Sequence, residues 1–184
     1  MNVLLVFLQI FLFPLIFLGL AWLFTVWAKK KHPRLIKVGY ATLFAITSYI
    51  VGGVVLFPLY LIFRPVKIEG ITYLMGVNLW AFWLISFVIV TPLVVAGTAY
   101  FLYFRKVAVT KYMKEALLIG LYQVPWGWFF EIVIYVYWRQ TIPSVYDYFF
   151  GKNFPWIDIN WLIGVLSPLI AAYFARKVST SRKD

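Results

Sequence analysis

Residues 116–138, ALLIGLYQVPWGWFFEIVIYVYW, decide the fold. A helix needs about 20 mainly apolar residues to cross the hydrocarbon core of a bilayer, and this stretch is long enough. Its only charged side chain is that of Glu131. The stretch therefore predicts a membrane-spanning helix with a carboxylate inside it, and the rest of the chain has to explain both the helix and the acid.

The composition of the chain agrees with an integral membrane protein. Hydrophobic residues make up 64% of the sequence and charged residues 12%, with a mean hydropathy of +0.89, whereas about a quarter of the residues in a soluble domain are charged. Four more runs are long and apolar enough to cross a bilayer. The predicted spans are residues 3–28, 38–63, 79–104, 116–138 and 157–175.

The residue inventory excludes several kinds of chemistry. The chain has no cysteine, which removes disulfide, thiolate and iron–sulfur chemistry. The single histidine, His32, lies in the charged run KKKHPR and cannot form a histidine cluster for zinc or haem. We therefore predict no metal and no cofactor. Nucleic acid is also not expected, because the basic residues behind the net charge of +11 lie between apolar runs.

The positions of lysine and arginine predict an orientation. Successive loops and the tail hold five, two, four, two and four of them: Lys29, Lys30, Lys31, Arg34 and Lys37; Arg64 and Lys67; Arg105, Lys106, Lys111 and Lys114; Arg139 and Lys152; Arg176, Lys177, Arg182 and Lys183. Since cytoplasmic loops carry the basic excess, the N-terminus is predicted outside and the C-terminus in the cytoplasm. The first run lacks the basic segment of a signal peptide, so we expect it to be retained.

These observations define the predicted architecture. Residues 1–184 are expected to form one all-α domain, a polytopic membrane protein with five transmembrane helices, in the plasma membrane because no organelle-targeting segment is found. The basic loops are expected to attract anionic membrane lipids. Each span contains a proline, which predicts kinks and room between the helices. These prolines are Pro14, Pro58, Pro92, Pro125 and Pro168.

The fifth span carries a stripe of small residues. Gly164, Ser167, Ala171 and Ala175 follow one another at intervals that place them on one helix face. Small side chains let another backbone approach closely. The stripe therefore predicts close packing, either inside the chain, with a second copy of it, or with another membrane protein.

Glu131 is the most informative polar residue. With the predicted orientation it lies about 10 Å below the outer membrane boundary. Placing a carboxylate there costs several kcal/mol, so such residues mark function by default. Trp128 and Tyr135 share its helix face, and further polar residues lie near the outer ends of the spans. The predicted ligand-binding residues are Glu131, Trp128, Tyr135, Gln9, Asn78, Asn160, Asp158 and Arg139.

Three functions fit these residues, and a fourth explanation is structural. The first is binding or transport of a small amphipathic or cationic solute or lipid in an outward-facing pocket centred on Glu131. The second is a non-catalytic accessory subunit of a larger membrane complex. The third is an isomerase or cyclase of isoprenoid-like lipids that uses Glu131 as an acid, although a second acid is available only at Asp158. In the structural explanation, Glu131 joins helices by a hydrogen bond to Gln9, Asn78 or Asn160.

Residues 139–157 form an unusually aromatic loop. Pro143, Gly151 and Pro155 interrupt it, so a continuous helix is not expected. Tyrosine and tryptophan favour the membrane interface, and we predict an interfacial segment with a short helix at residues 145–150. It serves either as a membrane anchor or as a lid over Glu131, with Gly151 as a hinge.

Overall fold

Five long helical segments dominate the structure. The computed structural model describes the backbone of residues 3–62, 66–68, 71–74, 77–151 and 156–180, and the side chains of residues 10–55, 86–151 and 159–179. Within this part of the chain, five helices are long and apolar enough to cross a membrane. The prediction of five helices long and apolar enough to span a membrane is therefore confirmed. Glu131 lies inside the fourth of these spans.

The spans differ in how regular they are. The first two are the continuous helices α1 (Val3–Lys31) and α2 (Ile36–Ile62), joined by a short 3₁₀ turn, η1 (Pro33–Leu35). The third and fourth are α-helices that end in π-helical segments: α3 (Leu79–Ala99) with η2 (Tyr100–Phe104), and α4 (Tyr112–Glu131) with η3 (Ile132–Trp138). The fifth consists of α6 (Trp156–Leu166) and α7 (Pro168–Thr180).

Hydrogen bonds show the change of helix type directly. The Arg139 amide donates to the Ile134 carbonyl at 2.8 Å, and the Arg105 amide donates to the Tyr100 carbonyl at 3.1 Å. Both bonds reach back five residues, as in a π-helix. Pro14, Pro92 and Pro125 lie inside α1, α3 and α4, while Pro168 begins α7. The kinks predicted at the prolines stay a prediction.

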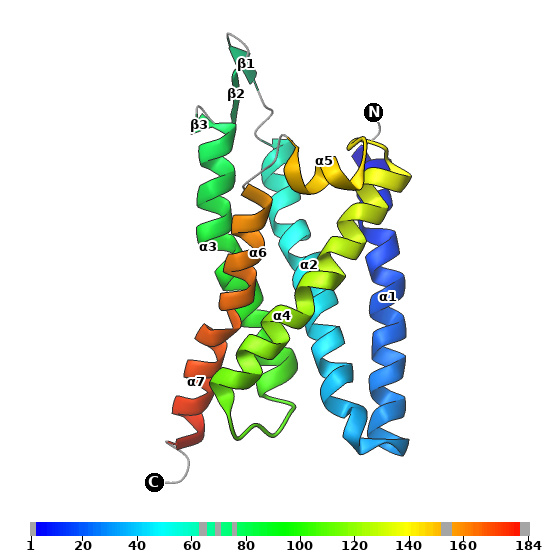
Figure 1. The fold of residues 1–184 in the computed structure, drawn as a ribbon, viewed down its shortest axis with the longest axis vertical. Helices are drawn as coiled ribbons and strands as arrows, with labels where there is room; N and C mark the ends of the chain where they lie inside the picture. The colour runs from blue at the N-terminus through cyan, green and yellow to red at the C-terminus, as the bar shows by residue number, and fades with distance from the viewer. Residues whose placement is uncertain (1–2, 63–65, 69–70, 75–76, 152–155, 181–184) are drawn as a thin grey trace.

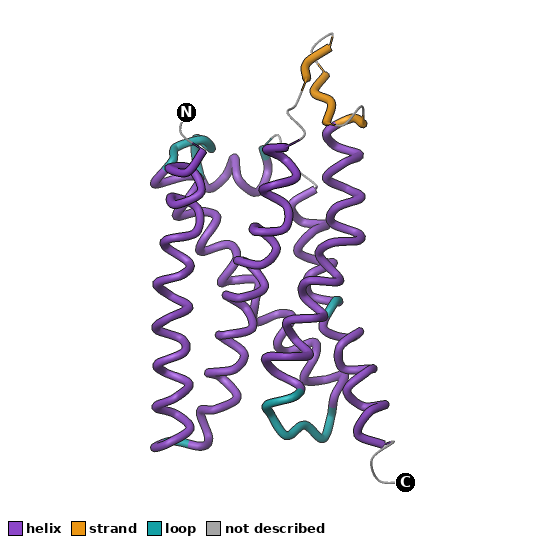
Figure 2. Tube along the Cα trace, turned by 180° about the vertical axis from the view of Figure 1, so that it is seen from behind, coloured by secondary structure: helices purple, strands orange, loops and turns teal. Residues whose placement is uncertain are grey.

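The helices run between two ends of the bundle, and α4 crosses it diagonally (Figure 1). The start of α1, the short helix α5 (Val145–Phe150) and the strands lie at one end, which we call the α5 end. The turn between α1 and α2, the loop before α4 and the end of α7 lie at the other end (Figures 1 and 2). These segments contain Lys29, Lys30, Lys31, Arg34, Lys37, Arg105, Lys106, Lys111, Lys114, Arg176 and Lys177, and we call this the basic end.

One feature departs from an all-α chain. Strands β1 (Val66–Ile68), β2 (Ile71–Leu74) and β3 (Val77–Asn78) form an antiparallel sheet in the order β1-β2-β3. The sheet lies beyond the α5 end of the bundle (Figure 2). Valine, isoleucine and threonine favour strands, and the short segment between α2 and α3 is rich in them. The predicted all-α architecture is thus confirmed for the spans, and the short sheet is confined to the loop between α2 and α3.

Close contacts between helices explain the small residues. The whole stripe of Gly164, Ser167, Ala171 and Ala175 is buried inside the chain, so it packs within the bundle. On the facing helix α4, a Cβ added to Gly120 would lie 2.2 Å from the Val165 carbonyl oxygen. Only glycine permits this approach. The fifth span is therefore held tightly against α4, which fixes one wall of the site described next.

Candidate ligand-binding cavity

A cavity of about 420 Å³ lies between the helices, and all five spans contribute to its wall. Most of the wall is apolar, with Ile10 and Phe11 from α1 and Phe87, Val90 and Val94 from α3. The polar part comes mainly from α4 with Gln123 and Glu131, from η3 with Tyr135, and from Arg139 directly after η3. Ligand sites in proteins typically combine an apolar wall with a few polar groups in this way.

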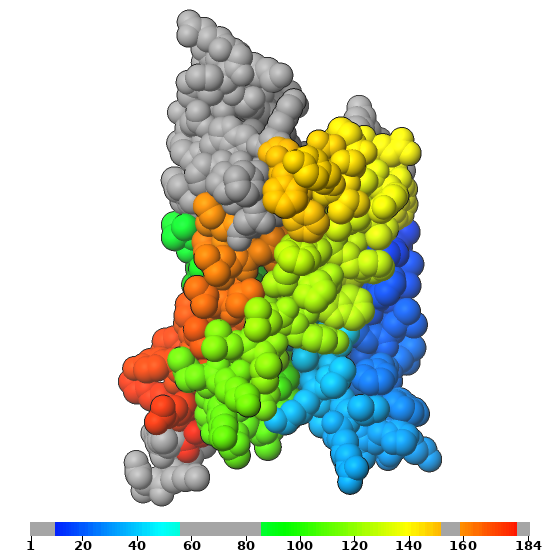
Figure 3. Space-filling model, viewed as in Figure 1, coloured from blue at the N-terminus to red at the C-terminus, as the bar shows by residue number. Residues whose placement is uncertain are grey.

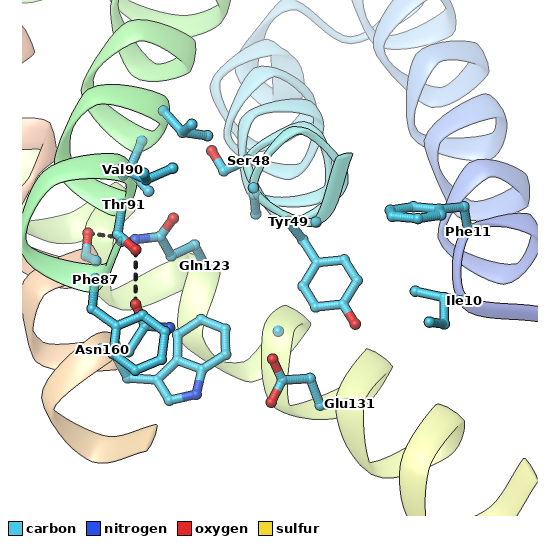
Figure 4. Close-up of a pocket in the computed structure, with 18 of the residues that line it drawn as sticks. Ile10, Phe11, Ser48, Tyr49, Phe87, Val90, Thr91, Gln123, Glu131 and Asn160 are labelled. Carbon is cyan, nitrogen blue, oxygen red and sulfur yellow. Dashed lines mark hydrogen bonds between the residues drawn. The ribbon is translucent and has the colours of Figure 1, made fainter. Parts of the chain in front are cut away.

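Glu131 is the last residue of α4, at the start of the π-helical segment η3. Its side chain is partly buried and lines the cavity. The Tyr148 hydroxyl donates a hydrogen bond to Glu131 Oε2. Across the cavity, the Tyr49 hydroxyl from α2 points towards the same carboxylate (Figure 4). The Glu131 carboxylate therefore lies near two tyrosine hydroxyls at the wall of the cavity.

Tyr148 belongs to α5, which confirms the short helix predicted at residues 145–150. The Ser144 hydroxyl caps α5 by accepting from the Asp147 amide at 3.1 Å, and it donates to Asp147 Oδ2 at 2.6 Å. Tyr148 itself is only 1% exposed. In the space-filling view, α5 and the end of the fourth span cover one face at the α5 end of the molecule (Figure 3). The hydrogen bond from Tyr148 thus ties this surface helix to the acid of the fourth span.

A second polar group lies on the α3 and α6 side of the cavity. The Thr91 hydroxyl donates to Asn160 Oδ1 at 2.8 Å. Gln123 Nε2 donates to the Gly164 carbonyl at 2.5 Å. Figure 4 shows Thr91, Asn160 and Gln123 on one side and Ile10 and Phe11 on the other. These bonds hold the polar groups in place around the apolar space.

Trp161 and Gly127 shape the wall between these two polar groups. Both line the cavity. A Cβ on Gly127 would lie 1.7 Å from Trp161 Cη2, so the indole ring rests directly on the backbone of α4. The absence of a side chain at residue 127 is therefore required for the indole to occupy this position.

The structure places the residues predicted from sequence in different ways. Glu131, Tyr135, Asn160 and Arg139 line one cavity. Trp128 is not among the cavity residues, and its ring packs edge-on against Phe149 with centroids 5.1 Å apart. Gly127 faces the cavity, and the next residue on an α-helix is turned by about 100°. The side chains of Gln9, Asn78 and Asp158 lie outside the described residues.

Several residues in or next to the cavity were not predicted from the sequence. Tyr148 was part of the predicted lid but not recognised as the partner of Glu131. Tyr49, Thr91, Gln123 and Trp161 were also missed as part of the site. Isolated hydroxyls, amides and aromatics are common in membrane helices, and only their convergence on one space distinguishes them.

Comparison with known proteins provides no further guide. No protein-family model, curated protein or solved structure matches the chain. Among the described residues, no group of three or more histidine, aspartate or glutamate side chains is placed to hold a metal ion. The chemistry that the described cavity offers is that of a carboxylate, a guanidinium, phenols, hydroxyls and amides.

The link between α5 and Glu131 predicts the effect of a conservative substitution. Tyr148→Phe removes the hydroxyl and leaves the carboxylate oxygen without its donor, which costs about 1–3 kcal/mol. The α5 amides should then exchange with deuterium roughly 5-fold to 150-fold faster, as measured by mass spectrometry of the purified protein. Tyr146→Phe on the same helix is the matched control, because Tyr146 is 71% exposed. Equal exchange in the two variants would show that the bond does not hold α5.

Proposed function

We propose that the protein binds a small amphipathic ligand in this cavity and transports it within the membrane, with Glu131 as the central polar contact. The observation that carries the proposal is the cavity itself. Its volume of about 420 Å³ lies within the usual range of small-molecule sites, roughly 300–1,000 Å³. A carboxylate on its wall supplies a strong acceptor for a cationic or hydrogen-bonding group, and the apolar wall suits an aliphatic or aromatic body.

The arrangement of α5 supports a gated site. Tyr148 reaches from a surface helix to the acid that would contact the ligand. A ligand group that binds Glu131 competes with this hydrogen bond, so occupation of the cavity and release of α5 are coupled in this proposal. The second half of the lid hypothesis, hinge motion at Gly151, belongs to the same proposal.

The membrane orientation is part of the proposal as well. We place the basic end in the cytoplasm and the α5 end outside, with the N-terminus outside and the C-terminus inside, in the plasma membrane. The support is the concentration of lysine and arginine in the segments of the basic end. In this orientation Glu131 lies nearer to the outer surface, and the ligand enters from that side.

The rival functions receive less support. An accessory subunit was suggested by the small-residue stripe, but these residues are buried within the chain, so a partner would have to bind another face. An isomerase or cyclase would need a second acid near Glu131, and the candidate, Asp158, has its side chain outside the described residues.

A cavity-filling variant tests the proposal. Gly52 lines the cavity, and a Cβ added there would meet no described atom within 4 Å. We expect the leucine side chain of Gly52→Leu to fill the cavity. The amount of ligand that copurifies should fall at least about tenfold relative to the wild type. The measurement is mass spectrometry of the small molecules and lipids that remain bound after extraction into polymer nanodiscs.

Gly97→Leu is the matched control. Gly97 also has no described atom within 4 Å of an added Cβ, but it does not line the cavity. This variant should retain the ligand, and both variants should melt near the wild-type temperature. If Gly52→Leu keeps the same bound molecules as Gly97→Leu, or if the wild type carries none, the cavity is not a ligand site.

A further inference from the structure

Two side chains of opposite charge line the same cavity. Glu131 and Arg139 both belong to its wall. They are eight positions apart, with Glu131 inside the fourth span and Arg139 directly after it, which corresponds to about two helical turns. Opposite charges in a low-dielectric interior attract each other strongly, so a direct ion pair would be the simplest arrangement.

The structure does not contain that ion pair. Among the described residues, the recorded ion pair joins Lys37 and Glu115 at 2.6 Å, near the basic end. Glu131 instead accepts a hydrogen bond from Tyr148 through Oε2, and this is the bond with which a ligand group would compete. The guanidinium carbon of Arg139 lies 5.8 Å from the centre of the Tyr135 ring. Glu131 and Arg139 thus each interact with a tyrosine side chain and do not form an ion pair with each other.

The hydrogen-bonding capacity of the two groups defines a complementary ligand. A carboxylate only accepts hydrogen bonds, and it suits an ammonium group. A guanidinium only donates, in a planar fork that matches a phosphate or a carboxylate. The remaining wall is largely apolar, with Ile10, Phe11 and Phe87 among its residues.

We infer that the ligand is a zwitterionic amphiphile, whose ammonium group binds Glu131, whose anionic group binds Arg139 and whose aliphatic tail lies on the apolar wall. The inference rests on the proposed function and narrows its ligand class. A purely cationic ligand leaves Arg139 unpaired, and a purely anionic one leaves Glu131 unpaired. An unpaired charge in a desolvated site is costly, so a ligand with both charges is favoured over either alone.

Three amphiphiles with one tail test this inference. The protein is purified in dodecyl maltoside and titrated with dodecyl phosphoethanolamine, dodecylamine or dodecyl phosphate, and bound probe is counted by native mass spectrometry. Binding to Gly52→Leu is subtracted as the background outside the cavity. We expect the zwitterion to bind at least about tenfold more tightly than either singly charged probe. Phosphoethanolamine without a tail should bind at least about tenfold more weakly than its dodecyl form.

Charge-removing variants assign the two contacts. Glu131→Gln should reduce the advantage of the zwitterion over dodecyl phosphate to within about threefold, and Arg139→Gln should do the same for dodecylamine. Arg105→Gln is the matched control. Arg105 also follows a π-helical segment and lies over an aromatic ring, with its Cζ 5.6 Å from the Phe101 centroid, but it is not a cavity residue. This variant should keep the wild-type preference.

The outcomes separate this inference from the proposed function. If the wild type binds dodecylamine or dodecyl phosphate as tightly as the zwitterion, above the Gly52→Leu background, the amphiphile site stands and the zwitterion inference is overturned. If phosphoethanolamine alone binds as tightly as its dodecyl form, the apolar wall does not hold the tail, and the amphiphilic ligand of both proposals is overturned. If no probe binds above that background, both proposals fail.

Discussion

Phe130→Ala is expected to lower the free energy of unfolding by about 3–5 kcal/mol, the usual cost of removing a buried phenylalanine side chain. Phe130 is completely buried. Among the described residues five aromatic rings lie next to it, those of Phe13, Phe17, Tyr49, Trp126 and the adjacent Phe129, with centroid separations of 5.8, 5.8, 5.2, 6.0 and 5.6 Å. In a membrane, helices associate through van der Waals packing, so a void at this position loses contacts between α1, α2 and α4 together.

The adjacent phenylalanine provides the control for this experiment. Phe129 contacts Phe13 and Phe17 as well, but it is 40% exposed on the bundle surface. Phe129→Ala should therefore cost at most about 1 kcal/mol. Both values are obtained by titrating the protein in bicelles with dodecyl sulfate and following helix content. Equal losses for the two variants would contradict the ring packing described above.

The second large loss of stability is expected for a glycine-to-alanine substitution. Gly120→Ala adds one methyl group, whose carbon would lie 2.2 Å from the Val165 carbonyl oxygen. Because the obstacle is backbone, no side-chain rotation relieves the clash, and α4 and α6 must move apart. We expect a loss of about 3 kcal/mol, at the upper end of typical overpacking costs, and a lower melting temperature in detergent.

Gly97→Ala serves as the control for Gly120→Ala. An added Cβ at Gly97 meets no described atom within 4 Å. The same substitution should therefore change the unfolding free energy by no more than about 0.5 kcal/mol. A wild-type melting temperature for Gly120→Ala would mean that the two helices do not cross as closely as the structure has them.

The sequence predicted the membrane helices well because span length is a simple physical constraint. A bilayer of fixed thickness demands about 20 apolar residues whatever their packing, so the five runs could be counted directly. The third predicted span began at residue 79, where α3 begins. The short helix at residues 145–150 was also predictable, because proline and glycine bound a compact aromatic segment. Serine at residue 144 then caps it.

The site was only partly predictable. Glu131 stood out because a lone acid in an apolar span is expensive. Its partner Tyr148 could not be identified, since many tyrosines compete for that role and helix packing alone decides which one reaches the acid. Trp128 was expected to frame Glu131 by helical spacing, yet the indole that lines the cavity belongs to Trp161. The sheet β1-β2-β3 was missed because short strands in a loop give a weak periodic signal.

The π-helical segment η3 lies between Glu131 and Arg139, and this has an evolutionary consequence. A π-turn holds one more residue than an α-turn. Because each residue of a π-helix turns less about the helix axis than the roughly 100° of an α-helix, an α-helix with the same number of residues would point Arg139 in another direction relative to Glu131. The acid and the guanidinium would then no longer share one chamber, even with every cavity side chain retained. Among homologues, a π-helical segment between the two charges should therefore be a more sensitive marker of shared ligand chemistry than overall sequence identity.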